Sequence, residues 1–225
     1  MKRVFQILVS VLVLLLWSCG SDQPREASDK EGIIHYDIKY LDDPNEYAII
    51  TFLPNTMTYT FKDNKSIQKV SGYGGLFRMI GMADSKSGKV VAFMKIIADK
   101  YMQKSEISEN SIGYDPIDSL TITYTGDTKN IAGYLCKEAV AEADGQKYTL
   151  YFTNDIHIKN PNWNTPFKNI DGVLLEYQIK LFGINTRITA TKVENIPIDD
   201  KAFDVPEDYA LVPMDTIRNT VKKYM

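Results

Sequence analysis

The feature that most constrains the fold is an alternation of apolar and polar residues that recurs in short segments along the chain. Residues 33–41 show it clearly, because Ile34, Tyr36, Ile38 and Tyr40 alternate with polar side chains. A period of two places each class of residue on one face of a β-strand. Short stretches rich in Asp, Asn, Gly and Ser separate these segments, as expected for hairpin turns. The sequence therefore predicts a mainly β, antiparallel protein.

The predicted strands share this alternation or are rich in β-branched and aromatic residues. They cover residues 33–41, 47–53, 57–61, 66–71, 76–83, 89–97, 120–124, 132–141, 148–152, 173–181 and 186–193. Residues 94–104 fit either a helix or a strand, and Val90, Val91 and Phe93 upstream favour strand, turn and strand. Turns are expected at 126–129 and 143–146. A sheet of about ten strands must close, curl or cover its edges, so we expect a strongly curved sheet or half-barrel.

Two segments near the C-terminus break the strand pattern. Residues 154–172 contain two prolines, several asparagines and the isolated Trp163 and Phe167, and such long loops are usually functional or packed on themselves. Asp215 is a candidate N-cap for a short terminal helix. Ile217, Val221 and Tyr224 would lie on one face of that helix.

The first residues predict export and lipidation. A cationic start (Lys2, Arg3) precedes an apolar run over 4–17, which is short for a membrane-spanning helix. Ser18 and Cys19 then resemble the lipobox of bacterial lipoproteins, in which the cysteine carries acyl chains such as palmitate. An uncleaved N-terminal anchor is the alternative. Two or more acyl chains hold a protein stably at a membrane.

This resemblance implies a signal peptide over 1–18 and a lipidated Cys19, which a polar tether over 19–31 follows. The remaining residues, 32–225, have the length of one domain, which the strand pattern predicts to be β-rich. The expected location is the cell envelope, at the outer membrane and facing the periplasm or the cell surface. The chain has 26 basic and 29 acidic residues, a net charge of −3, and cleavage would remove Lys2 and Arg3. A domain of that sign is not expected to seek nucleic acid or an anionic bilayer.

Three short motifs resemble a known protein family. They are KNIAGYLCKEA at 129–139, YFTNDI at 151–156 and IDGVLLEY at 170–177. Together they are similar to an uncharacterised family (a domain of unknown function) of Gram-negative bacterial lipoproteins. The resemblance implies a LolA/LolB-like fold, a strongly curved antiparallel sheet that holds loops or helices against its concave face. It implies no activity.

The candidates for catalysis are few. Cys136 has no histidine nearby in sequence, so we expect a buried structural thiol, and with Cys19 acylated no intramolecular disulfide can form. His35 shares a strand face with charged residues. Asp155 and His157 could form a hydrolase pair, but no serine elbow accompanies them. No zinc or calcium spacing occurs. We therefore expect no enzyme activity, no metal and no cofactor.

The main hypothesis is a non-catalytic lipoprotein that binds an apolar ligand, an acyl chain or lipid, on the concave face of the sheet. The aromatic content, 14 Tyr and 9 Phe, fits either such a cavity or a filled core. The residues expected to line the cavity are Tyr134, Leu150, Phe152, Trp163, Phe167 and Tyr177. The alternative is an envelope-assembly component that binds a protein partner through exposed sheet edges and the loop over 154–172.

Overall fold

The chain forms one large, open β-sheet. The computed structural model describes residues 30–45, 50, 53–106, 119–143, 145–181 and 183–224. In these residues 12 strands pair in the order β12-β6-β5-β4-β3-β2-β1-β11-β10-β9-β8-β7. Neighbours pair antiparallel, except that β12 runs parallel to β6. The prediction of a mainly β, antiparallel fold is confirmed.

The strand bounds are β1 Glu31–Tyr40, β2 Thr56–Lys62, β3 Lys65–Gly72, β4 Phe77–Asp84, β5 Lys89–Ile96, β6 Asp99–Glu106, β7 Thr121–Ile131, β8 Tyr134–Ala143, β9 Gln146–Thr153, β10 Val173–Leu181, β11 Ile184–Glu194 and β12 Ala210–Leu211. The helical segments are the 3-10 turns η3 (Tyr73–Gly75) and η4 (Asp200–Phe203) and the α-helix α2 (Met214–Tyr224). The strand–turn–strand prediction for 94–104 is confirmed by β5 and β6.

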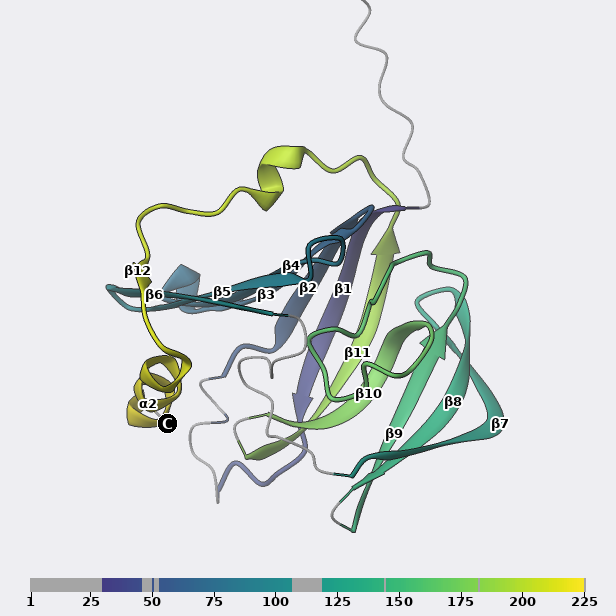
Figure 1. The fold of residues 1–225 in the computed structure, drawn as a ribbon. Helices are drawn as coiled ribbons and strands as arrows, with labels where there is room; N and C mark the ends of the chain where they lie inside the picture. The colour runs from purple at the N-terminus through teal and green to yellow at the C-terminus, as the bar shows by residue number, and fades with distance from the viewer. Residues whose placement is uncertain are drawn as a thin grey trace, which may run out of the picture.

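The sheet is curved and its two edges do not pair. Figure 1 shows the half made of β2–β6 turned steeply away from the half made of β7–β11, with the loop 154–172 between them. The curvature also brings β7 close to β11 in space, although three strands separate them in the sheet. Within the described part of the chain, β12 and β7 remain the free edges.

One side of the sheet, which we call the inner face, carries the core. Register places Tyr177 beside Leu150 and Tyr36 beside Met57 on this face. The loop 154–172 packs against it through Phe167. α2 covers the same face on the other half of the sheet, where buried Ile217 packs with the apolar side chains Ala92, Met94 and Ile96. The loop and the terminal helix thus pack on the same face of the sheet.

One predicted turn is wrong. Residues 126–129 belong to β7, and Gly126 (φ +89°) lies where the register shifts between Tyr124 and Thr128. The chain turns instead at Ala132 and Gly133, which have φ of +49° and +88°. Gly133 serves as a turn residue through its positive φ, and nothing lies within 4 Å of the position its Cβ would take.

Several predictions lie partly or wholly outside the described residues. The signal peptide, Cys19 and nearly all of the tether fall there. Of the predicted strand over 47–53, residues 50 and 53 are described, and neither is in a strand. Within the described residues, no helix combines the length and the apolar character needed to cross a membrane.

Candidate functional site

Four of the six residues expected to line a cavity are buried in one core on the inner face. Leu150, Phe152 and Tyr177 project from β9 and β10, and Phe167 comes from the loop. Trp163, also from the loop, is buried in a separate small cluster with Ala83 and Val90. Tyr134 on β8 is partly buried and packs against the same core, in which Cys136 and Ala139 are also buried.

The loop 154–172 fills the space above β9 and β10 with its own apolar side chains. The ring of Phe167 lies 6.5 Å from that of Tyr177 and 6.2 Å from that of Tyr148, centroid to centroid. Ile156 and Ile170 are buried in the same core. The loop thus acts as the second layer of the domain over this half of the sheet.

Trp163 joins the loop to the other half of the sheet. Its indole Nε1 donates a hydrogen bond to Ser66 Oγ on β3 at 2.7 Å, and the ring is 4% exposed. Gly81 on β4 leaves room for the indole, since a Cβ there would lie 3.1 Å from Trp163 Cη2. Beside it, Asn164 donates to the side-chain oxygen of Gln68.

Asn162 braces the loop from within. Its Nδ2 donates to the carbonyls of Ile170 and Gly172 at 3.0 and 2.8 Å, and the side chain is buried. Gly172 closes the loop with φ +138°, where a Cβ would lie 2.7 Å from Phe152 Cδ2. Only glycine fits this position, because both the backbone conformation and the space exclude a side chain.

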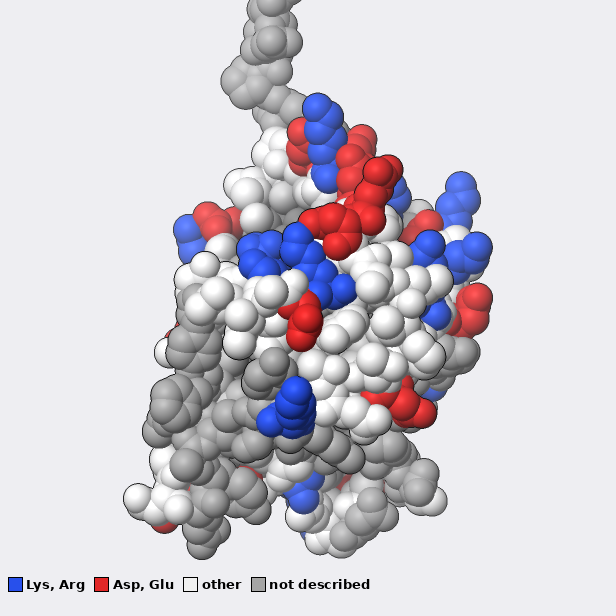
Figure 2. Space-filling model, turned by 90° about the vertical axis from the view of Figure 1, so that its left-hand side faces the viewer, with Lys and Arg blue, Asp and Glu red and all other residues white. Residues whose placement is uncertain are grey.

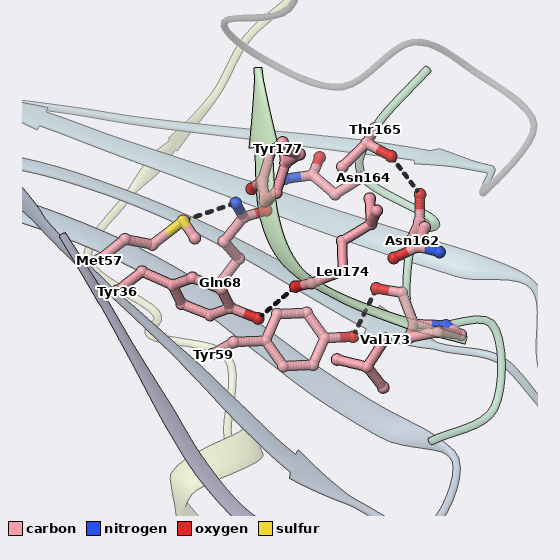
Figure 3. A pocket seen from close by; sticks show the side chains of 11 residues that line it. Tyr36, Met57, Tyr59, Gln68, Asn162, Asn164, Thr165, Val173, Leu174 and Tyr177 are labelled. Atoms are coloured by element: carbon pink, nitrogen blue, oxygen red, sulfur yellow. Dashed lines mark hydrogen bonds between the residues drawn. The ribbon is translucent and has the colours of Figure 1, made fainter. Parts of the chain in front are cut away.

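A small cavity separates the loop from the sheet (Figure 3). It measures about 20 Å³ and is lined by residues of β1, β2, β3, β10 and the loop. Tyr36 donates to the Leu174 carbonyl at 2.9 Å and Tyr59 to the Pro161 carbonyl at 3.1 Å. The space suits a single water molecule, for which roughly 10–15 Å³ is needed. An acyl chain would have to replace part of the loop.

Both tyrosines are buried, and burial changes the pKa of Tyr59 strongly. Burial raises the pKa of Tyr59 to about 12, although hydrogen bonds to Ser66 and Trp163 oppose the shift. The phenol therefore stays protonated and acts as a donor to the loop over the physiological range of pH. Of the six residues predicted to line a site, Tyr177 borders this cavity.

A second, more open cavity of about 240 Å³ lies at the far end of β9–β11. Its lining is mixed, and comprises Leu41, Gln146, Lys147, Tyr148, Gln178, Ile179, Asn185 and Thr186. Several of its polar groups already have partners. Tyr148 donates to Gln146 Oε1 at 2.9 Å, and Asn185 Nδ2 donates to Asp42 Oδ1 at 2.8 Å. Its size would admit a small polar molecule and not a whole acyl chain.

A polar contact and a buried cysteine lie close together near the β7–β8 hairpin, where Cys136 pairs with Lys129 and belongs to the main core. Lys129 on β7 contacts both carboxylate oxygens of Glu176 on β10 at 2.9 Å, which ties the curled edge of the sheet to its middle. The predicted burial of Cys136 is confirmed, because the residue is 0% exposed. Burial, with the negative charges of Asp155 and Glu176, raises the pKa of Cys136 to about 11. Its thiol therefore stays protonated near neutral pH.

One of the two histidines, His35, lies beside a carboxylate of the neighbouring strand. His35 Nε2 lies 2.6 Å from Glu194 Oε2 across β1 and β11, and Glu194 also accepts from Lys192 at 2.6 Å. These bonds, Lys192 first, lower the pKa of Glu194. The backbone N–H of Asp155 donates a hydrogen bond to Thr153 Oγ1 at 3.3 Å. In the residues that the structure describes, no group of three or more His, Cys, Asp or Glu side chains could hold a metal ion.

Sequence reasoning missed several residues at this site. Tyr36 and Tyr59 line the small cavity, and their alternation within strands predicted only that they share a buried face. Gln68 and Asn162 carried no signal, because their partners are set by tertiary contacts. The two aromatic residues of the loop were found because large apolar side chains are unusual in a polar loop.

Comparisons with known proteins bear on the fold alone. No family model matches the sequence, and no curated protein matches it. Two solved structures of a protein named PNGF-II, in space groups C2 and P21, resemble the fold with TM-scores of 0.56 and 0.54 at 15% and 14% identity. The matches cover 86% of this chain but 33% and 34% of the PNGF-II chain. This chain therefore spans about a third of the protein that it resembles.

Proposed function

We propose that the chain is a non-catalytic lipoprotein of the bacterial cell envelope that binds an apolar ligand, such as an acyl chain, on the inner face of its sheet. Cys19 would carry the membrane anchor. The observation that supports ligand binding is the kind of segment that covers the apolar inner face of the sheet. Aromatic and aliphatic side chains of β1, β2, β9 and β10 are covered by a loop without regular secondary structure, over residues 154–172.

The finer description of the fold as LolA/LolB-like belongs to the same proposal. Its support is the curved antiparallel sheet with a loop and a helix on one face. Such a fold presents the inner face as the binding surface, and the apolar side chains of the loop would occupy it when no ligand is present.

Ligand entry would begin where the loop is held by a few polar contacts. On the side of β2–β4 the loop bonds through Trp163 to Ser66 and through Asn164 to Gln68. Such bonds contribute about 0.5–1.5 kcal/mol each. The buried Trp163 ring packs there in a small cluster with Ala83 and Val90, whereas Phe167 is buried in the main core. The loop would therefore lift first from β3 and β4, and Phe167 would leave last.

A fluorescence titration tests the ligand proposal. A chain of residues 20–225 keeps every described strand and has Trp163 as its single tryptophan, because the other one is Trp17. Titration with a C16 fatty acid should shift the emission of Trp163 to longer wavelength and increase its quenching by acrylamide. Native mass spectrometry of protein purified from cells should show bound lipid.

A variant with a less firmly held loop makes this test more sensitive. Asn162→Ala removes both bonds that brace the loop, so it should bind the fatty acid more tightly than the wild type. Leu135→Ser, an exposed position on β8, is the matched control and should behave as wild type. Clean apo masses and unchanged emission in both the wild type and Asn162→Ala would exclude the ligand.

The anchor has its own test. Cys19→Ser should abolish incorporation of labelled palmitate in cells and release the protein from the membrane fraction. Labelling that persists in this variant would contradict lipidation at Cys19.

Exposure of β7 favours a second candidate function, the binding of a protein partner along the sheet edge. β7 is an edge strand with nine of its 11 residues exposed, and Tyr124 is 58% exposed. Unpaired edges of this length are templates for an added strand. A photo-crosslinker at Tyr124 of the full-length domain should capture one specific envelope protein. A crosslinking pattern no different from that of a probe at Lys147 would exclude this edge.

A further inference from the structure

Two large apolar side chains are exposed side by side at one end of the sheet. Leu76 precedes β4 and is 53% exposed, and Ile97 follows β5 and is 57% exposed. The Ile97 N–H donates to the Leu76 carbonyl at 2.7 Å, so the β3–β4 and β5–β6 connections lie against each other. We call these two residues the apolar tip.

Ile97 is an unexpected residue for its position. It is the first of two turn residues between Ile96 and Asp99, and its φ is +57°. Hairpins of this kind take Gly, Asn or Asp where φ is positive, and a β-branched residue there is a genuine outlier. The strain is not offset by burial, since more than half of the side chain is exposed. Strain of this kind is concentrated at functional sites.

Behind the tip, three cations lie directly opposite one another on adjacent strands. Arg78 of β4 pairs with Lys95 of β5, which pairs with Lys100 of β6. Like charges in such positions destabilise a sheet. In the described part of the molecule, Asp208 forms an ion pair with Lys100, while Arg78 Nε is buried without a hydrogen-bond partner. We call the three residues the basic row.

These positive charges lie close together on a protein whose net charge is negative. Figure 2 looks onto the left-hand side of Figure 1, where β6 and β12 lie, and shows Lys and Arg side chains grouped in the middle of this face beside acidic ones. The net charge of −3 means that attraction to an anionic surface must come from such a group. A cationic group next to exposed aliphatic side chains is the arrangement by which proteins lie in a bilayer interface.

We propose that the apolar tip and the basic row form a second membrane contact, in which Leu76 and Ile97 enter the interface of an anionic phospholipid bilayer and the row binds lipid phosphates. Each cation near such a surface contributes about a fivefold gain in affinity. Burial of the exposed half of one aliphatic side chain contributes about the same factor. This contact is independent of acylation at Cys19 and of any ligand under the loop.

Vesicle sedimentation of residues 20–225 tests the proposal without the lipid anchor. The protein should bind vesicles with about 30% phosphatidylglycerol at low salt, and bind pure phosphatidylcholine vesicles at least about tenfold more weakly. Arg78→Gln with Lys95→Gln should lower the affinity about 25-fold. Asp208→Asn should raise it, because it removes the carboxylate that neutralises Lys100.

Ile97→Asn separates a membrane role from a structural one. Asparagine tolerates positive φ, so this variant should be at least as stable as the wild type in urea, yet bind anionic vesicles about fivefold more weakly. Two controls match it. Ala132→Asn relieves the same backbone conformation on another hairpin, and Leu135→Ser removes another exposed leucine, so both should keep wild-type binding.

Three results would overturn the proposal. They are no sedimentation of the wild type with anionic vesicles at low salt, equal binding to both vesicle types, and full binding by Ile97→Asn. None of these results bears on ligand binding under the loop, which Trp163 emission reports without vesicles.

Discussion

Gly81 is the position at which the seating of the loop on the sheet can be tested most directly. In Gly81→Ala the added methyl group would lie 3.1 Å from Trp163 Cη2 and 3.7 Å from Asn164 Nδ2. Overpacking of this kind destabilises by about 1–3 kcal/mol. Alanine also reduces the entropy of the unfolded chain, which stabilises the folded protein by about 0.4–1 kcal/mol. The net expectation is a loss of about 0.5–2 kcal/mol in the free energy of unfolding.

Trp163→Phe supplies the second arm of the experiment. Phenylalanine lacks the outer indole atoms that the new methyl group would meet, so the double variant should be more stable than the sum of the single effects. A coupling of about 1–2 kcal/mol is expected between residues in contact. Urea unfolding followed by circular dichroism measures all four proteins. Additivity within about 0.3 kcal/mol would mean that Trp163 does not rest on Gly81, and the loop would then not be seated on β4.

Three other contacts give expectations of the same kind. Because burial holds the pKa of Tyr59 at about 12 in the folded state, against 10.0 for an unburied tyrosine, its contribution to stability is complete below pH 10 and is lost as pH rises through 12. The loss is on the order of 3 kcal/mol between urea unfolding at about pH 9 and at about pH 12, and Tyr59→Phe should reduce it. Cys136 should resist Ellman's reagent at mildly alkaline pH until the protein unfolds, and rapid labelling of the native state would contradict its burial. Lys129→Met should destabilise by about 1 kcal/mol through the loss of its contact with Glu176, whereas exposed Lys137→Met should have no measurable effect.

The strands could be read from the sequence because alternation is a direct consequence of strand geometry. The turn after β7 could not, since Gly126 and Ala132 both adopt positive φ while the local composition favours a turn only at the first. A bulge and a turn require the same residue types. β12 also carried no signal, because two residues are too few to show a period.

The inner face of β8 shows a different limit. It carries the small, buried residues Ala139, Ala141 and Ala143, while the bulkier Val140 lies on the opposite side. Size and hydrophobicity therefore do not identify the face of this strand that turns inward. Which face of a strand turns inward is decided by the register with its neighbours, and a shift of one residue reverses it.

How an apolar ligand could bind depends on two free energies: that of burying the loop side chains and that of burying the ligand in their place. Ile156, Trp163, Phe167 and Ile170 are each at most 6% exposed. Burying four such side chains contributes about 6–12 kcal/mol, and a C16 acyl chain gains a similar amount at about 0.8 kcal/mol per CH₂ group. An acyl chain that displaced the whole loop would therefore gain little, and one that displaced only the part held by Trp163 would gain several kcal/mol. Binding would then loosen the loop from β3 and β4 and leave Phe167 between Tyr148 and Tyr177. Increased quenching of Trp163 with Phe167 still in place is the signature of that partial exchange.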